Sequence, residues 1–238
     1  LAASVHEAVK TLLPASNFSI TLYDSATSMI SFPYHVDEQD VDWAPRKLGK
    51  GLTSYVIRTG RPLRTTPEIV ADLEASGEVL GDGVQSVDWL GVPLRSKQMV
   101  TGVIAIQTYG NSPTRITDKH TSIMSVLAPQ VSSAIERFFA ELEIQKFKLG
   151  IDRSESAVFI TDTHGEIQYA NPAFEKVYGY AQEEAIGKNP RILKSGLISL
   201  EQYKYFWDTL LSGGTVSGEL TNRRKDGTLI PIAGMNSP

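Results

Sequence analysis

The sequence predicts an α+β protein of two domains, each a central antiparallel β-sheet flanked by helices, with a long helix that joins them. Two observations support this prediction. Each half of the chain starts with two short apolar strands around a turn, continues with short helices, and ends with a second pair of strands. Between the halves lies a long segment with apolar residues at helical spacing. Sheets covered by helices in this way leave room for a pocket between the sheet and the helices.

Composition narrows the classes of function. The length of 238 residues fits two small domains, and the hydrophobic share of 41% is enough to form a core in each. The formal net charge of −4 provides no basic field for nucleic acid or an anionic membrane, and we expect neither as a partner. No run approaches the roughly 20 apolar residues of a membrane span, and no signal peptide is visible, so we expect a cytoplasmic location.

Residues that carry catalysis or bind metals are scarce. The sequence has no cysteine, which excludes disulfides, zinc–cysteine sites, iron–sulfur clusters and a cysteine nucleophile. The four histidines, His6, His35, His120 and His164, lack metal-ligand spacing. No G-x-S-x-G, G-G-D-E-F or kinase phosphoacceptor motif is present. We therefore predict no catalytic residues, no metal site and no enzyme activity in this chain.

The first half shows clear strand patterns. Residues 17–23 alternate, with Phe18, Ile20 and Leu22 on one face, which predicts a half-buried strand, and residues 29–34 predict its hairpin partner. The other expected elements are helices over 5–13, over 52–59 before Gly60, and over 67–76 capped by Thr66, a surface loop over 77–86, and a hairpin of strands over 88–94 and 99–109.

A long helix is expected from about residue 118, with Thr117 as its N-cap. Its apolar residues alternate steps of three and four, which is the heptad spacing of a coiled-coil seam. The seam residues are Ala128, Val131, Ile135, Phe138, Leu142 and Leu149, with Gln145 between the last two. The seam predicts a homodimer, with a connector packed on the next domain as the alternative. We place the first domain at residues 1–140, a helical linker at 141–150 and the second domain at 151–238.

The second half repeats the order of the first. Asn171 followed by Pro172 is a strong helix start, since an amide cap precedes proline at the first helical position. The other expected elements are a hairpin of strands over 157–161 and 166–170, short helices over 173–178 and 182–186, a helix over 199–211 capped by Ser199, and a hairpin of strands over 216–222 and 228–236.

Two runs in the first half resemble GAF domains of bacterial sensor proteins. They are G-L-x-x-x-V-x-x-x-G-x-P-L at residues 51–63 and S-V-x-W-L-G-V-P-L at residues 86–94. The GAF family binds cyclic nucleotides, bilins or other small molecules. Attachment of a bilin through a thioether needs a cysteine, which this sequence lacks, so the resemblance implies no such bilin. Our expectation from the sequence is a vacant or structural GAF domain.

The second half resembles a PAS domain of the S-box type. The resemblance rests on residues 159–174 (F-I-T-D-T-H-G-E-I-Q-Y-A-N-P-A-F), on Y-G-Y at 178–180 and on N-R-R-K-D-G-T at 222–228. A PAS sheet has one more strand after the one that ends near Pro238. The resemblance therefore implies a C-terminally incomplete domain in which an edge strand is missing.

The segment G-K-N-P-R-I-L at 187–193 is similar to the G-x-N-C-R-F-L segment of LOV flavin photosensors. Pro190 replaces the cysteine of the light-driven adduct, so adduct chemistry is excluded. The resemblance implies that Asn189 and Arg191 reach a flavin's polar tail and phosphate, and that Asn222 faces its ring. Trp207 matches a tryptophan of the flavin redox sensors among nitrogen-fixation regulators.

A flavin, FAD or FMN, is therefore one alternative for the PAS domain. The other alternative is a PAS domain that holds no ligand, with Trp207 as a core residue. Ile232 stands where LOV domains have a second asparagine, which weakens the flavin alternative. No haem is expected, because no histidine falls within residues 178–192.

Together the two resemblances imply a sensory module. It would perceive a small molecule, a redox state or a partner and relay the signal to an output domain elsewhere in the polypeptide. We expect a histidine kinase of a two-component phosphorelay as that output. The alternatives are a diguanylate cyclase or phosphodiesterase as output, a flavin redox or light sensor, and a ligand-free dimerisation spacer.

Overall fold

A computed structural model describes residues 2–39, 43–81, 86–110 and 112–238. The chain divides into two compact units, Leu1–Glu141 and Leu142–Pro238, and each is described by itself below. The predicted α+β class is confirmed, because antiparallel strands and helices occur in both units and a long helix, α4 (Asp118–Asp152), runs from one into the other. No helix in the described ranges is long and apolar enough to cross a membrane.

The first unit is built on a six-stranded antiparallel sheet in the order β3-β2-β1-β6-β5-β4. Its strands are β1 (Asn17–Asp24), β2 (Met29–Val36), β3 (Arg46–Lys47), β4 (Leu63–Thr65), β5 (Asp88–Ser96) and β6 (Met99–Thr108). Both predicted hairpins are confirmed, since β1 pairs with β2 and β5 with β6. β1 and β6 join the two hairpins at the centre of the sheet. The short edge strands β3 and β4 were not predicted.

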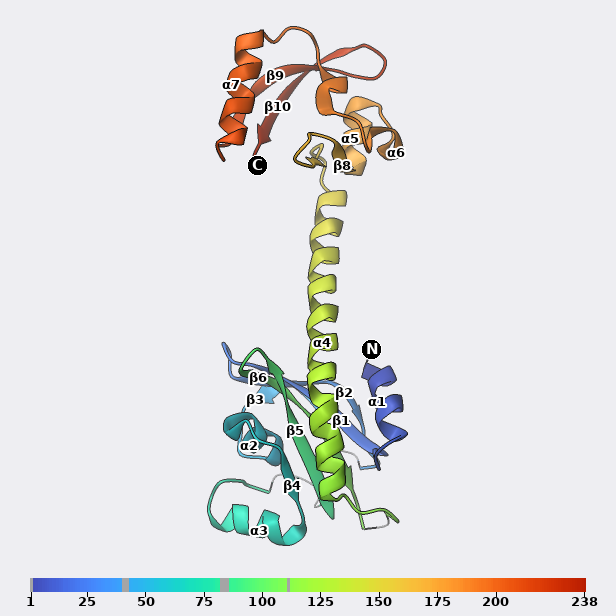
Figure 1. Cartoon of the computed structure of the whole chain (residues 1–238), viewed down its shortest axis with the longest axis vertical. Helices are drawn as coiled ribbons and strands as arrows, with labels where there is room; N and C mark the ends of the chain where they lie inside the picture. Colours follow the sequence, from blue (N-terminus) through green and yellow to red (C-terminus); the bar gives the residue numbers. More distant parts are fainter. Residues whose placement is uncertain (1, 40–42, 82–85, 111) are drawn as a thin grey trace. The chain divides into compact units, whose positions relative to one another are not determined.

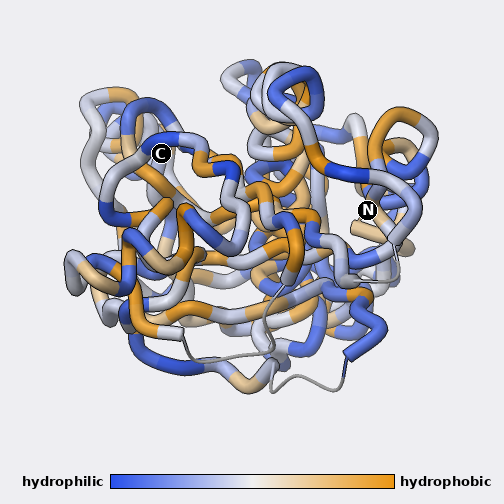
Figure 2. The backbone as a smooth tube through the Cα atoms, turned by 90° about the horizontal axis from the view of Figure 1, so that it is seen from below, coloured by the Kyte–Doolittle hydropathy of each residue, from blue (hydrophilic) through white to orange (hydrophobic). Residues whose placement is uncertain are grey.

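Helices cover both faces of this sheet. α1 (Ala2–Lys10) and α4 lie on one face, and α2 (Leu52–Thr59) lies on the other (Figure 1). Because successive side chains of a strand point to opposite faces, Leu90 of β5 packs in the core with residues of α1 and α4, and Trp89 packs with residues of α2. α3 (Pro67–Ala75) lies on the same side as α2. In the backbone coloured by hydropathy, apolar stretches gather in the strands and the helices packed on them (Figure 2).

The helix ends follow the predictions in part. α1 ends at Lys10, three residues before the predicted end. α2 ends at Gly60, whose φ of 64° is in the left-handed region that glycine favours. Thr66 stands before α3 as predicted, but its hydroxyl donates to the Glu68 carboxylate (2.6 Å) and makes no capping hydrogen bond. The predicted cap at Thr66 is therefore wrong in its hydrogen bond, because a nearby acceptor captures the hydroxyl.

A buried carboxylate fastens the start of α4 to the sheet. The Asp88 side chain is 2% exposed, and Arg115 donates to it from Nε (2.6 Å) and Nη2 (2.9 Å). The Ile116 N–H and the Thr108 hydroxyl also donate to Asp88, at 3.1 and 3.3 Å. Arg115 holds the pKa of Asp88 below its usual range. We call this group the Asp88 clamp.

The second unit has two separate antiparallel hairpins and short helices around one core. Its elements are β7 (Phe159–Thr161), β8 (Ile167–Ala170), α5 (Pro172–Tyr178), α6 (Gln182–Ala185), the 3₁₀ helix η1 (Pro190–Leu193), α7 (Leu200–Leu211), β9 (Val216–Arg223) and β10 (Leu229–Asn236). β7 pairs with β8 and β9 with β10, so the strands do not form the single sheet that we expected here. The edge strand expected beyond Pro238 stays a prediction.

The core of the second unit forms where the sequence patterns converge. Ile167, Phe174 and Ala185 are completely buried, and Tyr178 and Leu193 pack with them. Both predicted caps are confirmed, because the Asn171 side chain accepts from the Phe174 N–H and the Ser199 side chain from the Gln202 N–H.

The Asp88 clamp leads to a stability prediction. Asp88→Asn should lower the free energy of unfolding by about 1–3 kcal/mol at pH 7, because hydrogen bonds to a buried charge are lost. The folded pKa of Asp88 is lowered, so its contribution is complete above the ordinary aspartate pKa of about 3.9 and is lost as the pH falls through the folded value. Denaturant titrations followed by tryptophan fluorescence at pH 7 and at lower pH measure both effects.

The matched control is Asp118→Asn. Asp118 also pairs with an arginine, Arg64, at 2.9 Å, but its side chain is 90% exposed, so its replacement should change stability little. Two outcomes would contradict the role given to burial. One is an equal loss of unfolding free energy in the two variants, and the other is a loss in Asp88→Asn that does not become smaller at low pH.

Candidate functional site

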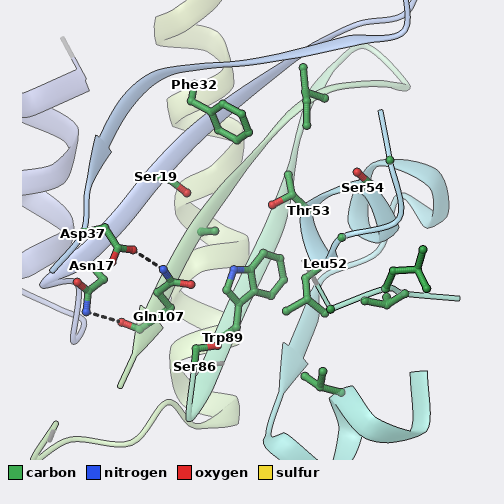
Figure 3. Close-up of a pocket in the computed structure, with 18 of the residues that line it drawn as sticks. Asn17, Ser19, Phe32, Asp37, Leu52, Thr53, Ser54, Ser86, Trp89 and Gln107 are labelled. Atoms are coloured by element: carbon green, nitrogen blue, oxygen red, sulfur yellow. Dashed lines mark hydrogen bonds between the residues drawn. The ribbon is translucent and has the colours of Figure 1, made fainter. Parts of the chain in front are cut away.

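The first unit contains a pocket of about 260 Å³ between the sheet and the segment that includes α2 and α3 (Figure 3). Strand alternation explains its floor, because β1, β5 and β6 place Ser19, Trp89, Ala105 and Gln107 on this face. The GAF-like runs quoted above contribute Gly51–Ser54 and Trp89 to its lining. The signal for this site was thus present in the sequence, although we predicted no site there.

One part of the pocket wall is apolar and aromatic. Trp89, Ile30 and Val79 are each less than a tenth exposed, and Phe32 and Leu52 also belong to this part of the lining. The indole of Trp89 lies against Gly91, where a Cβ atom would come within 2.1 Å of the ring. The glycine two residues after the tryptophan is therefore required for the position of the indole.

Val79 also corrects a prediction about residues 77–86. We expected a plain surface loop, but Val79 is 1% exposed and lines the pocket together with Leu80 and Gly81. Part of that loop, residues 82–85, lies outside the described residues.

One end of the pocket is a network around Asp37. Gln107 donates its side-chain amide to the Asp37 carboxylate and to the Tyr109 hydroxyl (2.8 Å), and that hydroxyl donates to Asp37 (3.0 Å). The Asn17 amide donates to the Gln107 backbone carbonyl (3.3 Å). Burial, together with the neighbouring Asp37, raises the pKa of Tyr109, so this hydroxyl stays a neutral donor.

The other end of the pocket is the start of α2. Gly51 is the N-cap of this helix and has no side chain that could accept from its first N–H groups. Leu52, Thr53 and Ser54, the first residues of the helix, line the pocket, and Ser54 is 3% exposed. The Ser54 hydroxyl has no hydrogen bond to another residue of the described part of the chain. This end therefore presents hydrogen-bond donors.

Three of the four residues predicted for the PAS site lie together. Asn189, Arg191 and Trp207 line a depression of about 270 Å³ beside the turn between β7 and β8. Trp207 is 38% exposed and thus not the core residue of our alternative interpretation. Asn222 does not line this depression. Its amide donates to the Tyr178 hydroxyl (3.1 Å) in the core of the second unit.

These contacts do not fit the flavin site that the resemblance implied. The Asn189 side chain caps η1 by accepting from the Arg191 N–H (3.0 Å), and Asn222 is engaged with Tyr178. The groups expected on the ring and on the tail of a flavin do not converge on one cavity. We therefore assign no flavin chemistry to these residues. No cluster of three or more potential metal ligands occurs among the described residues.

The seam residues of α4 fall into two groups. Ala128 and Val131 are buried in the core of the first unit, and Ile135 packs against that core. Phe138 is 47% exposed, and Leu149 is 51% exposed. Leu142 is half-buried. The first part of the seam therefore serves the fold of its own domain, and the later part leaves apolar side chains at the surface.

Two family models match the chain. A GAF domain matches residues 1–136 and a PAS fold matches residues 145–238. A nitrogen fixation regulatory protein of Klebsiella oxytoca is 38% identical over 79 residues, which are 33% of this chain and 16% of that protein. The bacterioopsin transcriptional activator of Halobacterium salinarum is 26% identical over 163 residues, which are 68% of this chain and 23% of that protein. The chain thus spans less than a quarter of the length of these relatives.

Solved structures of both domain types are similar to the chain. The GAF domain of an Acinetobacter phosphoenolpyruvate-protein phosphotransferase is 20% identical to this chain, with a TM-score of 0.43. The match covers 58% of this chain and 79% of that chain. The PAS domain of a Colwellia psychrerythraea protein is 26% identical to this chain, with a TM-score of 0.35. The match covers 40% of this chain and 80% of that chain. The family match over more than half of the chain shows that the protein belongs to the GAF domain family, with a PAS fold after the GAF domain, and that it is a sensory signalling module.

Proposed function

We propose that this module binds a small molecule in the GAF pocket and relays the binding through α4 to the PAS fold and to an output domain in the same polypeptide. The pocket is the observation that carries the proposal. It combines an apolar and aromatic wall with polar groups held in place around Asp37 and at the start of α2, and converging polar groups of this kind orient ligands in small-molecule sites. This proposal replaces the vacant GAF domain that we expected from the sequence.

Strand β5 supports a relay from the pocket to α4. Trp89 forms a wall of the pocket, and the adjacent Asp88 holds Arg115 and Ile116 just before α4. Further along β5, the Arg95 N–H donates to the Ser132 hydroxyl in the middle part of α4 (2.9 Å). A ligand that displaces Trp89 would therefore act on the strand that anchors the helix.

The second unit holds the other end of α4 through Asn171. This side chain is completely buried and donates to the carbonyls of Ile151 and Ser156, both at 2.9 Å. Its oxygen accepts from the N–H groups of Val158 (2.9 Å) and Phe174 (3.1 Å). Asn171 thus joins the last turn of α4 to the start of α5, in addition to the capping role that we predicted. Tyr169 donates to Asp152, the last residue of α4.

The nature of the output domain belongs to the proposal as well. A histidine kinase in a phosphorelay was our expectation from the sequence. The two relatives described above are named as a regulatory protein and a transcriptional activator, which favours an output in gene regulation. We propose a homodimer through the exposed later part of the α4 seam, because Phe138, Leu142 and Leu149 continue the heptad spacing there.

Ligand binding is tested first with the pocket blocked. A bound ligand should raise the stability of the purified chain by about 2.7 kcal/mol at 100 times its Kd, and Ser19→Phe, which fills the pocket, should abolish this gain. A thermal-shift screen of metabolites measures the gain in stability for each variant. Ser25→Phe, in the exposed turn after β1, is the matched control and should respond like the unaltered chain. Equal stabilisation of Ser19→Phe would place the ligand outside the pocket.

The role of Asn171 predicts a local effect on α4. Asn171→Ala leaves buried backbone groups without partners and should lower the free energy of unfolding by about 3 kcal/mol or more. Hydrogen exchange should become faster at residues 149–152. The control Asn189→Ala removes a single exposed cap and should cost about 1 kcal/mol or less. Unchanged exchange at the end of α4 in Asn171→Ala would refute the connection.

The dimer is tested by a charge on the seam. The chain should sediment as a dimer, and Phe138→Glu should make it a monomer, because a carboxylate cannot be buried in the seam without a partner. Val126→Glu is the matched control, since Val126 is 73% exposed on the same helix but outside the seam, and this variant should remain dimeric. A chain that stays monomeric at high concentration contradicts the proposal.

A further inference from the structure

We infer that the GAF pocket takes a free α-amino acid with an apolar or aromatic side chain, with its ammonium group at Asp37 and its carboxylate at the start of α2. This inference rests on the proposed function, because it names the ligand class of the same pocket. Three features carry it, namely an acceptor end, a donor end, and an apolar wall between them.

The acceptor end has a fixed negative charge. Within the described part of the chain, Asp37 accepts from uncharged groups alone, which are the Gln39 N–H (2.9 Å), the Tyr109 hydroxyl (3.0 Å) and the Gln107 amide. Among the described residues, no cation forms an ion pair with Asp37. These donors hold the carboxylate in place without neutralising it, so a cationic group of a ligand is its natural complement.

At the donor end, no side chain of the described residues accepts a capping hydrogen bond from the start of α2. The first N–H groups of an α-helix lack acceptors within the helix and carry a partial positive charge. α2 has eight residues and starts at the pocket, after a glycine that has no capping side chain. The Ser54 hydroxyl, on a residue that is 3% exposed, adds a polar group that has no partner in the described part of the chain. A carboxylate would satisfy these donors together.

The two ends lie on opposite sides of an apolar region. Figure 3 shows Asp37 and Gln107 on one side, Thr53 and Ser54 on the other, and Trp89 between them. The volume of about 260 Å³ lies below the roughly 300–1,000 Å³ of pockets for larger ligands, which favours a molecule of amino-acid size.

The charges of the described lining residues also favour a zwitterion. Arg46 and Lys47 line the pocket, but so do the carboxylates Asp37 and Glu74. A ligand that is only an anion would have to approach both carboxylates, and a ligand that is only a cation would have to approach both basic residues and the start of α2. A molecule with one charge of each sign meets a complement at each end.

The full 238-residue chain is the sample for the test. It is titrated with the common amino acids while the tryptophan fluorescence is followed, since Trp43 and Trp89 line the pocket. Each amino acid that binds is compared with its 2-hydroxy acid, which lacks the ammonium group, and with its amine, which lacks the carboxylate. We expect at least one apolar amino acid to bind, and both analogues to bind at least tenfold more weakly.

Two variants test which residues bind the ligand at the acceptor end and at the donor end of the pocket. Asp37→Asn keeps the shape of the side chain but removes the charge, and it should weaken binding of the amino acid at least tenfold. Ser54→Ala should weaken it severalfold. Asp72→Asn is the matched control, because Asp72 is exposed on α3 and does not line the pocket. This variant should bind the amino acid with the same affinity as the unaltered chain.

The possible failures can be distinguished. The amino-acid assignment is overturned if no amino acid binds, if the hydroxy acid binds as tightly as its parent, or if Asp37→Asn binds like the unaltered chain. A molecule of another class that binds the chain but not Ser19→Phe overturns the assignment and supports the proposed function. Binding of every active compound to Ser19→Phe overturns both.

Discussion

The burial of both faces of β5 is the constraint on which the first unit depends. All residues from Asp88 to Leu94 are buried, so this part of β5 has no face toward solvent. One face supports the core with α1 and α4, and the other supports the pocket beneath α2. Because neighbouring side chains point to opposite sides, residues next to one another in β5 serve the core and the pocket in turn. The pocket and the long helix therefore share a single structural support.

Two aspartates in this unit show how the surroundings decide the role of the same side chain. Asp88 is paired with Arg115 and further hydrogen-bonded, so its charge is fully used within the protein. Among the described residues, Asp37 is held by neutral donors alone and lines a cavity, so its charge is available to the ligand that we propose. The first arrangement is that of a structural clamp, and the second is that of a binding site.

The helix α4 connects these features to the second unit. Its first part is fixed by buried contacts, and its last turn is held by the amide of Asn171. Between them the apolar residues of the helix are more exposed, as Phe138 shows. The helix is continuous from Asp118 to Asp152, with Pro129 inside it, and so links the two regions that the proposed relay connects. This arrangement is consistent with a sensory module in which the helix is the element that passes the signal.

The sequence by itself determined the elements that depend on local chemistry. The alternation over residues 17–23, Gly60 at the end of α2, the cap at Asn171 and the extent of α4 all follow from residues close together in the chain. Local patterns could not identify β3 and β4, because two or three residues show no period. They also misled at Thr66, where a neighbouring carboxylate competes for the hydroxyl.

Only the tertiary structure decided which polar groups meet. Gln107 and Asp37 are 70 residues apart and form one end of the pocket, and Asn171 reaches back 20 residues to Ile151. Asn222 was expected beside Asn189 and Arg191, but it donates to Tyr178 instead. Periodicity tells which face of an element is buried but not which element will cover it. The partner of each buried polar group is set when the elements pack, because only then does its loss of water have to be compensated.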